Sequence, residues 1–253
     1  MAPASPLVPR LRTVRAVVFD TDGVITDSAR VHAAAWQEAF DACLRAAGQH
    51  QPFDPVEDYR RYVDGKSRLD GAAAFLASRG LRLPAGAPDD PRGTGTVRAV
   101  AARKEQLFVR RLREGGIAAW PGSVRLLYAL RAQGVPCAAV SASRHAPELL
   151  AGAGVRDLFQ AVVDGNEAAR LRLPGKPDPA LFLEAARRLD AVPAEAAVIE
   201  DALAGVEAGR PGGFGLVIGV DRTTGPTTAA DLRGHGADLV VGDLAELLTT
   251  TEG

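Results

Sequence analysis

The sequence lacks several features that mark specialised classes of protein. It has only two cysteines, Cys43 and Cys137, which excludes a disulfide scaffold and a closely spaced thiol metal site. Its 30 basic and 31 acidic side chains nearly cancel, so it lacks the basic balance typical of nucleic-acid binding. It also lacks an apolar run near the ~18 residues of a membrane span, and the stretch from Met1 to Val14 lacks a signal-peptide core. These absences predict a cytoplasmic protein with no nucleic-acid or membrane partner.

The sequence does contain the composition of an ordinary globular protein. Hydrophobic residues make up 47% and charged residues 24% of the 253 residues. That length accommodates a core domain and a smaller inserted domain.

Short apolar, β-rich runs that end in polar residues recur along the chain. They cover residues 16–19, 136–140, 196–199 and 216–220, and they run into Asp20, Ser141, Glu200 and Asp221 respectively. Helical patterns lie between them, for example over residues 123–133 and 180–189. Alternation of buried strands and helices predicts an α/β fold, a doubly wound parallel sheet with a Rossmann-like core.

One long stretch departs from this alternation. Residues 31–114 show helical periodicity without a convincing strand, which predicts an inserted all-helical cap domain. The expected helices cover 29–47, 55–62, 68–79 and 96–113, with an irregular Pro/Gly/Asp-rich loop before the last. We therefore expect an α/β core domain over 1–28 and 116–253, which carries the active site, and a cap domain over 29–115.

Ligands of open parallel sheets bind beyond the carboxyl ends of the strands, so the residues that follow the apolar runs are candidate functional residues. They comprise Asp20 and Asp22 in one motif, Ser141, Lys176 before a proline, and the pair Glu200 and Asp201. Converging carboxylates repel each other by roughly 4 kcal/mol per close pair at an effective dielectric of about 20. A hard cation such as Mg²⁺ would relieve that repulsion, because it prefers oxygen ligands.

This pattern indicates phosphoryl transfer. We assign Asp20 and Asp201 as direct Mg²⁺ ligands, Glu200 as a direct or water-mediated ligand, and Asp22 as a ligand through its backbone carbonyl. With the cation and Lys176 neutralising charge, Asp20 can attack phosphorus, and Asp22 can exchange a proton with the leaving or attacking oxygen. Ser141 would donate its hydroxyl to a phosphoryl oxygen.

Each of these residues also has a purely structural interpretation. A pair of aspartates one residue apart is common in surface turns and N-caps. Ser141 could cap the helix expected near His145, and Lys176 could be a solvated loop lysine. The catalytic interpretation depends on all of these residues occurring together at strand or loop ends.

At these motifs the sequence resembles the haloacid dehalogenase superfamily, whose four motifs match Asp20 to Asp22, Ser141, Lys176 and the pair of Glu200 and Asp201 in order. The resemblance extends over nearly the whole chain and is greatest to the β-phosphoglucomutase group, which has a helical cap after the first motif. It implies substrate contacts by a set of cap and core residues: His32, Trp36, Gly65, Lys66, Arg68, Lys104, Ala142, Ser143, Arg144 and His145.

The resemblance also implies individual roles. His32 would couple cap closure to acid/base chemistry, Lys104 would contact the substrate, and Arg68 would bind the phosphate that is not transferred. Ser143, Arg144 and His145 would meet that phosphate from the core domain. Alternatively, His32 and Trp36 are neighbours on a helix face that pack against the core, and Lys66 and Arg68 are surface charges.

Three positions depart from the better-known mutases of this group. Ala202 stands where they carry a hydroxyl residue, His145 where they carry an amide, and Gly71 where the cap loop has a polar residue. These differences concern the sugar and the distal phosphate rather than the phosphoryl-transfer chemistry.

The expected function is a sugar phosphomutase of β-phosphoglucomutase type, which converts β-glucose 1-phosphate into glucose 6-phosphate through an aspartyl-phosphate and a bisphosphate intermediate. The alternative is a magnesium-dependent phosphatase of the same superfamily that acts on a small sugar phosphate. A third hypothesis is a non-catalytic binder of a phosphorylated ligand. We expect a monomer, because cap opening needs free space.

Overall fold

The computed structural model describes residues 7–222 and 229–249, which form two compact units. Unit 1 comprises residues 1–27 and 118–253, and unit 2 comprises residues 28–117. The sequence-based expectation that Met1 to Val14 lack a signal-peptide core concerns residues that lie partly outside the described ranges. Over the described ranges, no helix combines the length and the apolar character that crossing a membrane requires.

Unit 1 is built on a parallel six-stranded sheet with the order β3-β2-β1-β4-β5-β6. β1 is central, with Phe19 paired to Ala139 of β2 on one side and to Ile199 of β4 on the other. All strands point the same way, so their carboxyl ends share one edge. The strands are β1 (Ala16–Asp20), β2 (Cys137–Val140), β3 (Ala161–Val163), β4 (Ala196–Glu200), β5 (Leu216–Val220) and β6 (Leu239–Val241).

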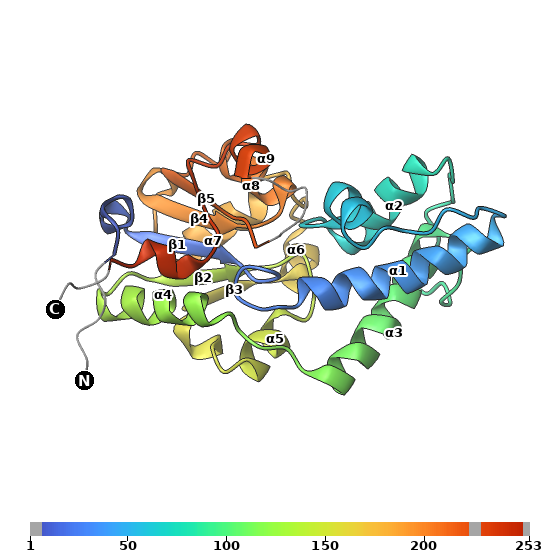
Figure 1. Ribbon diagram of the computed structural model, residues 1–253, viewed down its shortest axis with the longest axis horizontal. Helices are drawn as coiled ribbons and strands as arrows, with labels where there is room; N and C mark the ends of the chain where they lie inside the picture. Colours follow the sequence, from blue (N-terminus) through green and yellow to red (C-terminus); the bar gives the residue numbers. More distant parts are fainter. Residues whose placement is uncertain (1–6, 223–228, 250–253) are drawn as a thin grey trace. The chain divides into compact units, whose positions relative to one another are not determined.

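Helices cover both faces of this sheet, because successive strand residues point to opposite sides. Val17 and Phe19 of β1 pack with leucines of α4 on one face. Val18 packs with Phe182 of α7 on the other face, which also holds residues of α8 and α9. Figure 1 shows the strands between α4 and the pair α8 and α9. The helices are α4 (Pro121–Ala132), α5 (Ala146–Gly152), α6 (Gly165–Leu171), α7 (Ala180–Arg188), α8 (Leu203–Gly209) and α9 (Ala229–Gly234).

Unit 2 is helical over its described residues and has its own core. An aromatic cluster forms this core, with the ring centroid of Phe40 lying 4.6 Å from that of Trp36, 5.1 Å from that of Phe53 and 4.2 Å from that of Phe75. Ser67 accepts a hydrogen bond from the Asp70 amide at the start of α2, which fixes where that helix begins. The elements are α1 (Ala29–Ala46), a π-helical turn (Tyr59–Val63), α2 (Arg68–Ser78) and α3 (Val97–Gly115).

The predicted α/β class is confirmed, and four of the six strands were predicted. The helix expected over 55–62 forms later and in part as a π-helix: helical structure runs from Glu57, and Tyr59–Val63 is a π-helical turn. Asp54 explains the later start, since its carboxylate accepts hydrogen bonds from the amides of Val56 and Glu57 and holds residues 55 and 56 in a turn.

Candidate active site

The strand edge of unit 1 brings the predicted acidic residues together. Asp20 ends β1 and Glu200 ends the neighbouring β4. One carboxylate oxygen from each of Asp20, Glu200 and Asp201 lies within 4.8 Å of the other two. The cluster arises because parallel neighbouring strands end at the same level, so residues 180 positions apart in the chain become neighbours.

Lys176 lies inside this cluster. Its Nζ atom donates to Asp20 Oδ1 and to Glu200 Oε1, each at a distance of 2.5 Å, and its side chain is fully buried. Burial alone would lower the pKa of Lys176, but the two carboxylates outweigh it and hold that pKa above the ordinary value. Lys176 is therefore a permanent cation at the centre, not the solvated loop lysine of the structural interpretation.

Asp20 is in an environment that disfavours its charge. Burial raises the pKa of Asp20 well above its ordinary value, and the neighbouring charges of Glu200 and Asp22 add to that rise. Lys176 acts in the opposite direction through its charge and its hydrogen bond. A second positive charge at this position would favour the ionised carboxylate that a nucleophile requires.

Asp22 and Ser141 are linked directly. The Ser141 hydroxyl donates to Asp22 Oδ2 over 2.6 Å, and the same hydroxyl oxygen accepts from the Ser143 amide over 2.9 Å. Ser141 thus contacts the predicted acid/base residue and does not cap α5, whose N-cap residue is His145.

Two glycines allow the acidic residues to come so close. A Cβ atom on Gly23, whose φ is +90°, would lie 1.9 Å from Asp201 Oδ2. A Cβ atom on Gly205 in α8 would lie 1.7 Å from Glu200 Oε1. Real Cβ atoms do not approach other atoms at such distances, so both positions require glycine in this arrangement.

The loop after β2 carries Ala142, Ser143, Arg144 and His145, and the segment after β3 holds it in place. The Gly165 amide donates to the Ser143 carbonyl over 2.9 Å, and the Asn166 side chain donates to the Arg144 carbonyl over 3.1 Å. The Arg144 side chain is exposed. His145 Nδ1 lies 3.2 Å from a Glu148 carboxylate oxygen.

In unit 2 the structure pairs His32 of α1 with Lys104 of α3. Lys104 Nζ lies 2.7 Å from His32 Nδ1, and both side chains are buried. A lysine ammonium group can only donate, which makes Nδ1 of His32 the acceptor for a charged Lys104. The His32 ring stacks on Phe108 with centroids 4.0 Å apart.

The remaining predicted residues of unit 2 differ in their surroundings. Trp36 is 3% exposed and belongs to the aromatic core of unit 2, the position that the packing interpretation gives it. Gly65 and Lys66 lie in the loop between the π-helical turn and α2. Arg68 Nη1 forms an ion pair with Glu105 Oε2 over 2.5 Å, so its guanidinium already has an anionic partner.

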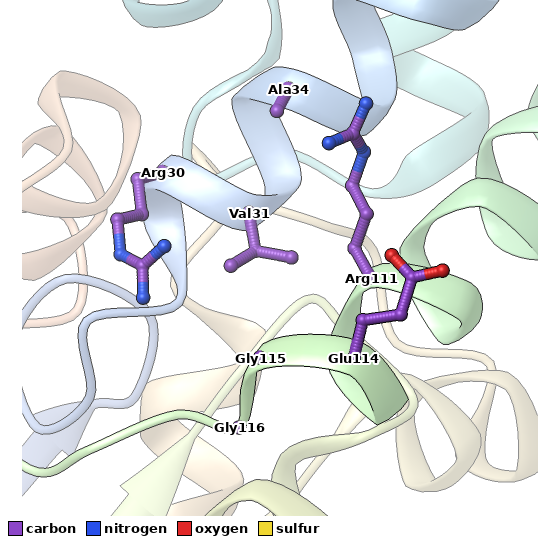
Figure 2. Close-up of a pocket in the computed structure, with 7 residues that line it drawn as sticks. All are labelled: Arg30, Val31, Ala34, Arg111, Glu114, Gly115 and Gly116. Atoms are coloured by element: carbon purple, nitrogen blue, oxygen red, sulfur yellow. The ribbon is translucent and has the colours of Figure 1, made fainter.

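A cavity of about 280 Å³ lies in unit 2, between the first turns of α1 and the end of α3. Figure 2 shows Arg30, Val31 and Ala34 on one side of it and Arg111 and Glu114 on the other. None of the predicted site residues line it. The predicted chemistry therefore belongs to the strand edge of unit 1 and not to this cavity.

The strand-edge cluster has the donor atoms of a hard-cation site. Its three carboxylates supply only oxygen atoms, the ligands that divalent magnesium and calcium prefer. Three anions beside a single buried lysine leave net negative charge, which a divalent cation would balance. The residues present thus fit a divalent metal.

A doubly wound sheet with buried carboxylates and a lysine at its strand edge defines the class of the protein: an α/β phosphoryl-transfer enzyme. The profile of haloacid dehalogenase-like hydrolases matches residues 14–213. The chain is 47% identical over 240 residues to a β-phosphoglucomutase of Mycobacterium tuberculosis, covering 93% of this chain and 92% of that one. It is 33% identical to the β-phosphoglucomutase of Bacillus subtilis, covering 87% and 88% of the two chains.

A solved structure of similar fold agrees with these relatives. The β-phosphoglucomutase of Clostridium difficile superposes with a TM-score of 0.72 at 25% identity, covering 92% of this chain and 93% of that one. The chain belongs to the haloacid dehalogenase-like hydrolase family and, within it, to the β-phosphoglucomutase-like group.

One residue near this site was not predicted. Arg222 follows β5 and donates to backbone carbonyls beside Asp22. The sequence indicates Arg222 only weakly. Like the other candidates, it lies just after an apolar run, next to Asp221, but an arginine at such a position is also common as a surface charge.

Proposed function

We propose that this protein is a sugar phosphomutase that converts β-glucose 1-phosphate into glucose 6-phosphate through an aspartyl-phosphate on Asp20 and a bisphosphate intermediate. The observation that carries the proposal is the buried bridge from Lys176 to Asp20 and Glu200, in a chain 47% identical to a β-phosphoglucomutase over 93% of its length. The bridge places a fixed cation beside the carboxylate that would attack phosphorus.

The chemistry proceeds in two matched steps. A carboxylate oxygen of Asp20 bonds to the 1-phosphoryl phosphorus of the bisphosphate while the bond from that phosphorus to the sugar oxygen breaks, and Asp22 gives the oxygen a proton, which leaves glucose 6-phosphate. In the second step Asp22 takes a proton from the 6-hydroxyl of β-glucose 1-phosphate, whose oxygen bonds to phosphorus as the bond to Asp20 breaks, which forms the bisphosphate again. The Ser141 hydroxyl holds the Asp22 carboxylate during both transfers.

We propose Mg²⁺ as the metal, held by Asp20, Asp201, Glu200 and the backbone carbonyl of Asp22. When bound, it would neutralise charge on the transferring oxygens and oppose the effect of burial on Asp20. Lys176 would remain bonded to Asp20 and Glu200, so the two carboxylates would keep their orientation with the metal present or absent.

A magnesium-dependent phosphatase is the second candidate, and one observation favours it. A mutase needs to bind a second phosphate, a role proposed for Arg68, but Arg68 is already paired with Glu105. If that ion pair persists with substrate present, the second phosphate loses a ligand and water becomes the competing acceptor.

Phosphorus NMR separates these candidates. The purified protein is given Mg²⁺, β-glucose 1-phosphate and a trace of β-glucose 1,6-bisphosphate, with Asp20→Asn as the inactive control. Growth of the glucose 6-phosphate signal supports the mutase, and growth of inorganic phosphate supports the phosphatase. If neither signal grows beyond that of the control, the substrate assignment is wrong.

A further inference from the structure

Arg222 lies just beyond β5 and holds the backbone that follows Asp22. Its Nε donates to the Gly23 carbonyl over 2.8 Å, and its Nη2 donates to the Val24 carbonyl over 3.1 Å. These are the first two carbonyl groups after that of Asp22. The Arg222 side chain is 11% exposed, so these bonds are largely shielded from water.

The rest of the guanidinium is also engaged. Nη2 donates to the Ser123 hydroxyl oxygen over 3.0 Å, and Nη1 pairs with Asp243 Oδ2 over 3.3 Å. The guanidinium carbon lies 4.4 Å from the centroid of the Trp120 ring. Arg222 thus joins segments that follow β1, β5 and β6 to the start of α4. A planar group with five donors can do this, whereas a lysine cannot.

The turn held by Arg222 is short and closed on itself. The Gly23 amide donates to the Thr26 carbonyl over 2.8 Å, and the amides of Ile25 and Thr26 donate to the Thr21 carbonyl over 3.1 and 3.0 Å. Asp22 is the second residue of this turn. A shift of this backbone therefore moves the Asp22 carbonyl and also the Cα atom that carries its carboxylate.

The same turn leads into the segment by which the chain leaves unit 1. The Trp120 amide donates to the Ile25 carbonyl over 2.9 Å, and the Asp27 amide donates to the Ala118 carbonyl over 3.0 Å. The segment that leaves unit 1 and the segment that returns to it are thus hydrogen-bonded to each other beside Arg222, which stacks on Trp120. Arg222 is positioned to fix this paired segment and the Asp22 turn as one piece.

We propose that Arg222 is a positioning residue for phosphoryl transfer. It does not touch the reacting atoms; it fixes the turn over residues 21–26 so that Asp22 keeps the orientation set by Ser141. The proposal rests on the proposed function for the reaction that Asp22 serves, but the rigidity it assigns to the turn is a property of the protein without substrate.

The test compares Arg222→Met and Arg222→Lys with the wild type. Met keeps much of the apolar stem and removes every donor, and Lys keeps the charge beside Asp243 but loses the fork and the stacking plane. Arg15→Gln is the matched control, because Arg15 forms an ion pair with Glu195 from a side chain that is 77% exposed.

Two readouts are measured: hydrogen exchange of the peptide covering residues 21–27 in the free protein, and kcat and KM of the isomerisation. For Arg222→Met we expect exchange in that peptide to accelerate about tenfold or more, because charge-assisted hydrogen bonds are lost. We expect kcat to fall about 10- to 100-fold with KM changed less than about threefold, since misplacement of an acid/base group affects the transition state. Arg222→Lys should fall between, and Arg15→Gln should match the wild type.

Unchanged exchange at 21–27, or kcat within twofold of the wild type, would overturn the proposal. So would equal acceleration of exchange in β4 and β5, because it would reveal a general loss of stability. If Arg222→Met does not fold, Arg222→Lys decides by the same criteria. If the wild type isomerises no sugar phosphate, the proposed function fails, and Arg222 is then judged on exchange and on hydrolysis of p-nitrophenyl phosphate.

Discussion

The Ser141 hydroxyl donates a hydrogen bond to the Asp22 carboxylate over 2.6 Å, joining the loops that follow β2 and β1. The sequence motifs predicted that Ser141 would donate to a phosphoryl oxygen of the substrate. In the structure its partner is the proposed acid/base residue, and its own oxygen is held by the Ser143 amide. Ser141 therefore orients the Asp22 carboxylate in the protein without substrate.

Ser141→Ala should lower kcat by about 10- to 100-fold, because the Asp22 carboxylate loses the donor that orients it. Ser141→Thr keeps the hydroxyl and should retain most of the activity. Steady-state kinetics of both variants, with their melting temperatures, give the comparison. If the Ala variant keeps kcat within twofold of the wild type, the bond has no part in catalysis.

Asp22→Ala should permit little steady turnover while still allowing phosphorylation of Asp20. The loss of a positioned acid/base group lowers kcat by about 10²- to 10⁴-fold, whereas the nucleophile and Lys176 stay in place. Incubation with labelled bisphosphate followed by acid precipitation measures the covalent phosphate. Asp20→Asn should show neither label nor turnover. Full activity of Asp22→Ala would refute the acid/base assignment.

Gly205→Ala should destabilise unit 1 and displace Glu200. The added methyl group would lie 1.7 Å from Glu200 Oε1 in a buried site, and overpacking of this kind costs about 1–3 kcal/mol. Gly152 is the matched control, since it also lies in a seven-residue helix of unit 1 and its Cβ would meet nothing within 4 Å. Gly152→Ala should instead stabilise by about 0.5–1 kcal/mol. Urea unfolding of both variants tests the contrast, which equal effects would contradict.

Arg188→Gln should lower the melting temperature by a few degrees at pH 7 and by less in acid. Arg188 bonds to both Glu167 and Glu184 and links α7 to α6. Hydrogen bonds from Arg170 and then Arg188 lower the pKa of Glu167 from 4.5 to about 2, and bonds from Arg187 and Arg188 lower that of Glu184 to about 2.

The sign of the pH effect follows from these lowered values. A carboxylate with a depressed folded-state pKa stabilises the fold fully above its unfolded value, and this contribution is lost as the pH falls through the folded value. The difference between wild type and Arg188→Gln should therefore shrink between about pH 5 and pH 2. Arg15→Gln is the control, since Arg15 is 77% exposed and pairs with Glu195, away from Glu167 and Glu184. A difference that stays constant with pH would exclude this origin.

Much of the fold could be predicted because its central strands are buried on both faces. β1, β4 and β5 are continuous apolar runs and were found, as was β2. β3 and β6 were missed because they are edge strands of only three residues, Ala161–Val163 and Leu239–Val241, and an apolar run of that length is too short to indicate a strand by itself.

The candidate site could be predicted only in part, for a related physical reason. Strand ends identify Asp20 and Glu200, because topology alone brings such positions together. The partners of side chains are set by tertiary contacts: nothing in the sequence indicates that Ser141 faces Asp22, that Arg68 pairs with Glu105, or that Arg222 reaches the turn after Asp22. The Trp36 ring shows the same limit, since helical spacing alone could not separate a substrate contact from core packing.

The hydrogen bond between the Asp27 amide and the Ala118 carbonyl means that unit 2 leaves and returns at adjacent points of the backbone. The whole insert could therefore be excised and the ends joined by a tight turn, without lengthening or shortening the path of any strand in the sheet. Unit 1 could therefore accept a different insert at this one position of the backbone, while Asp20 and Lys176 stay on the same sheet.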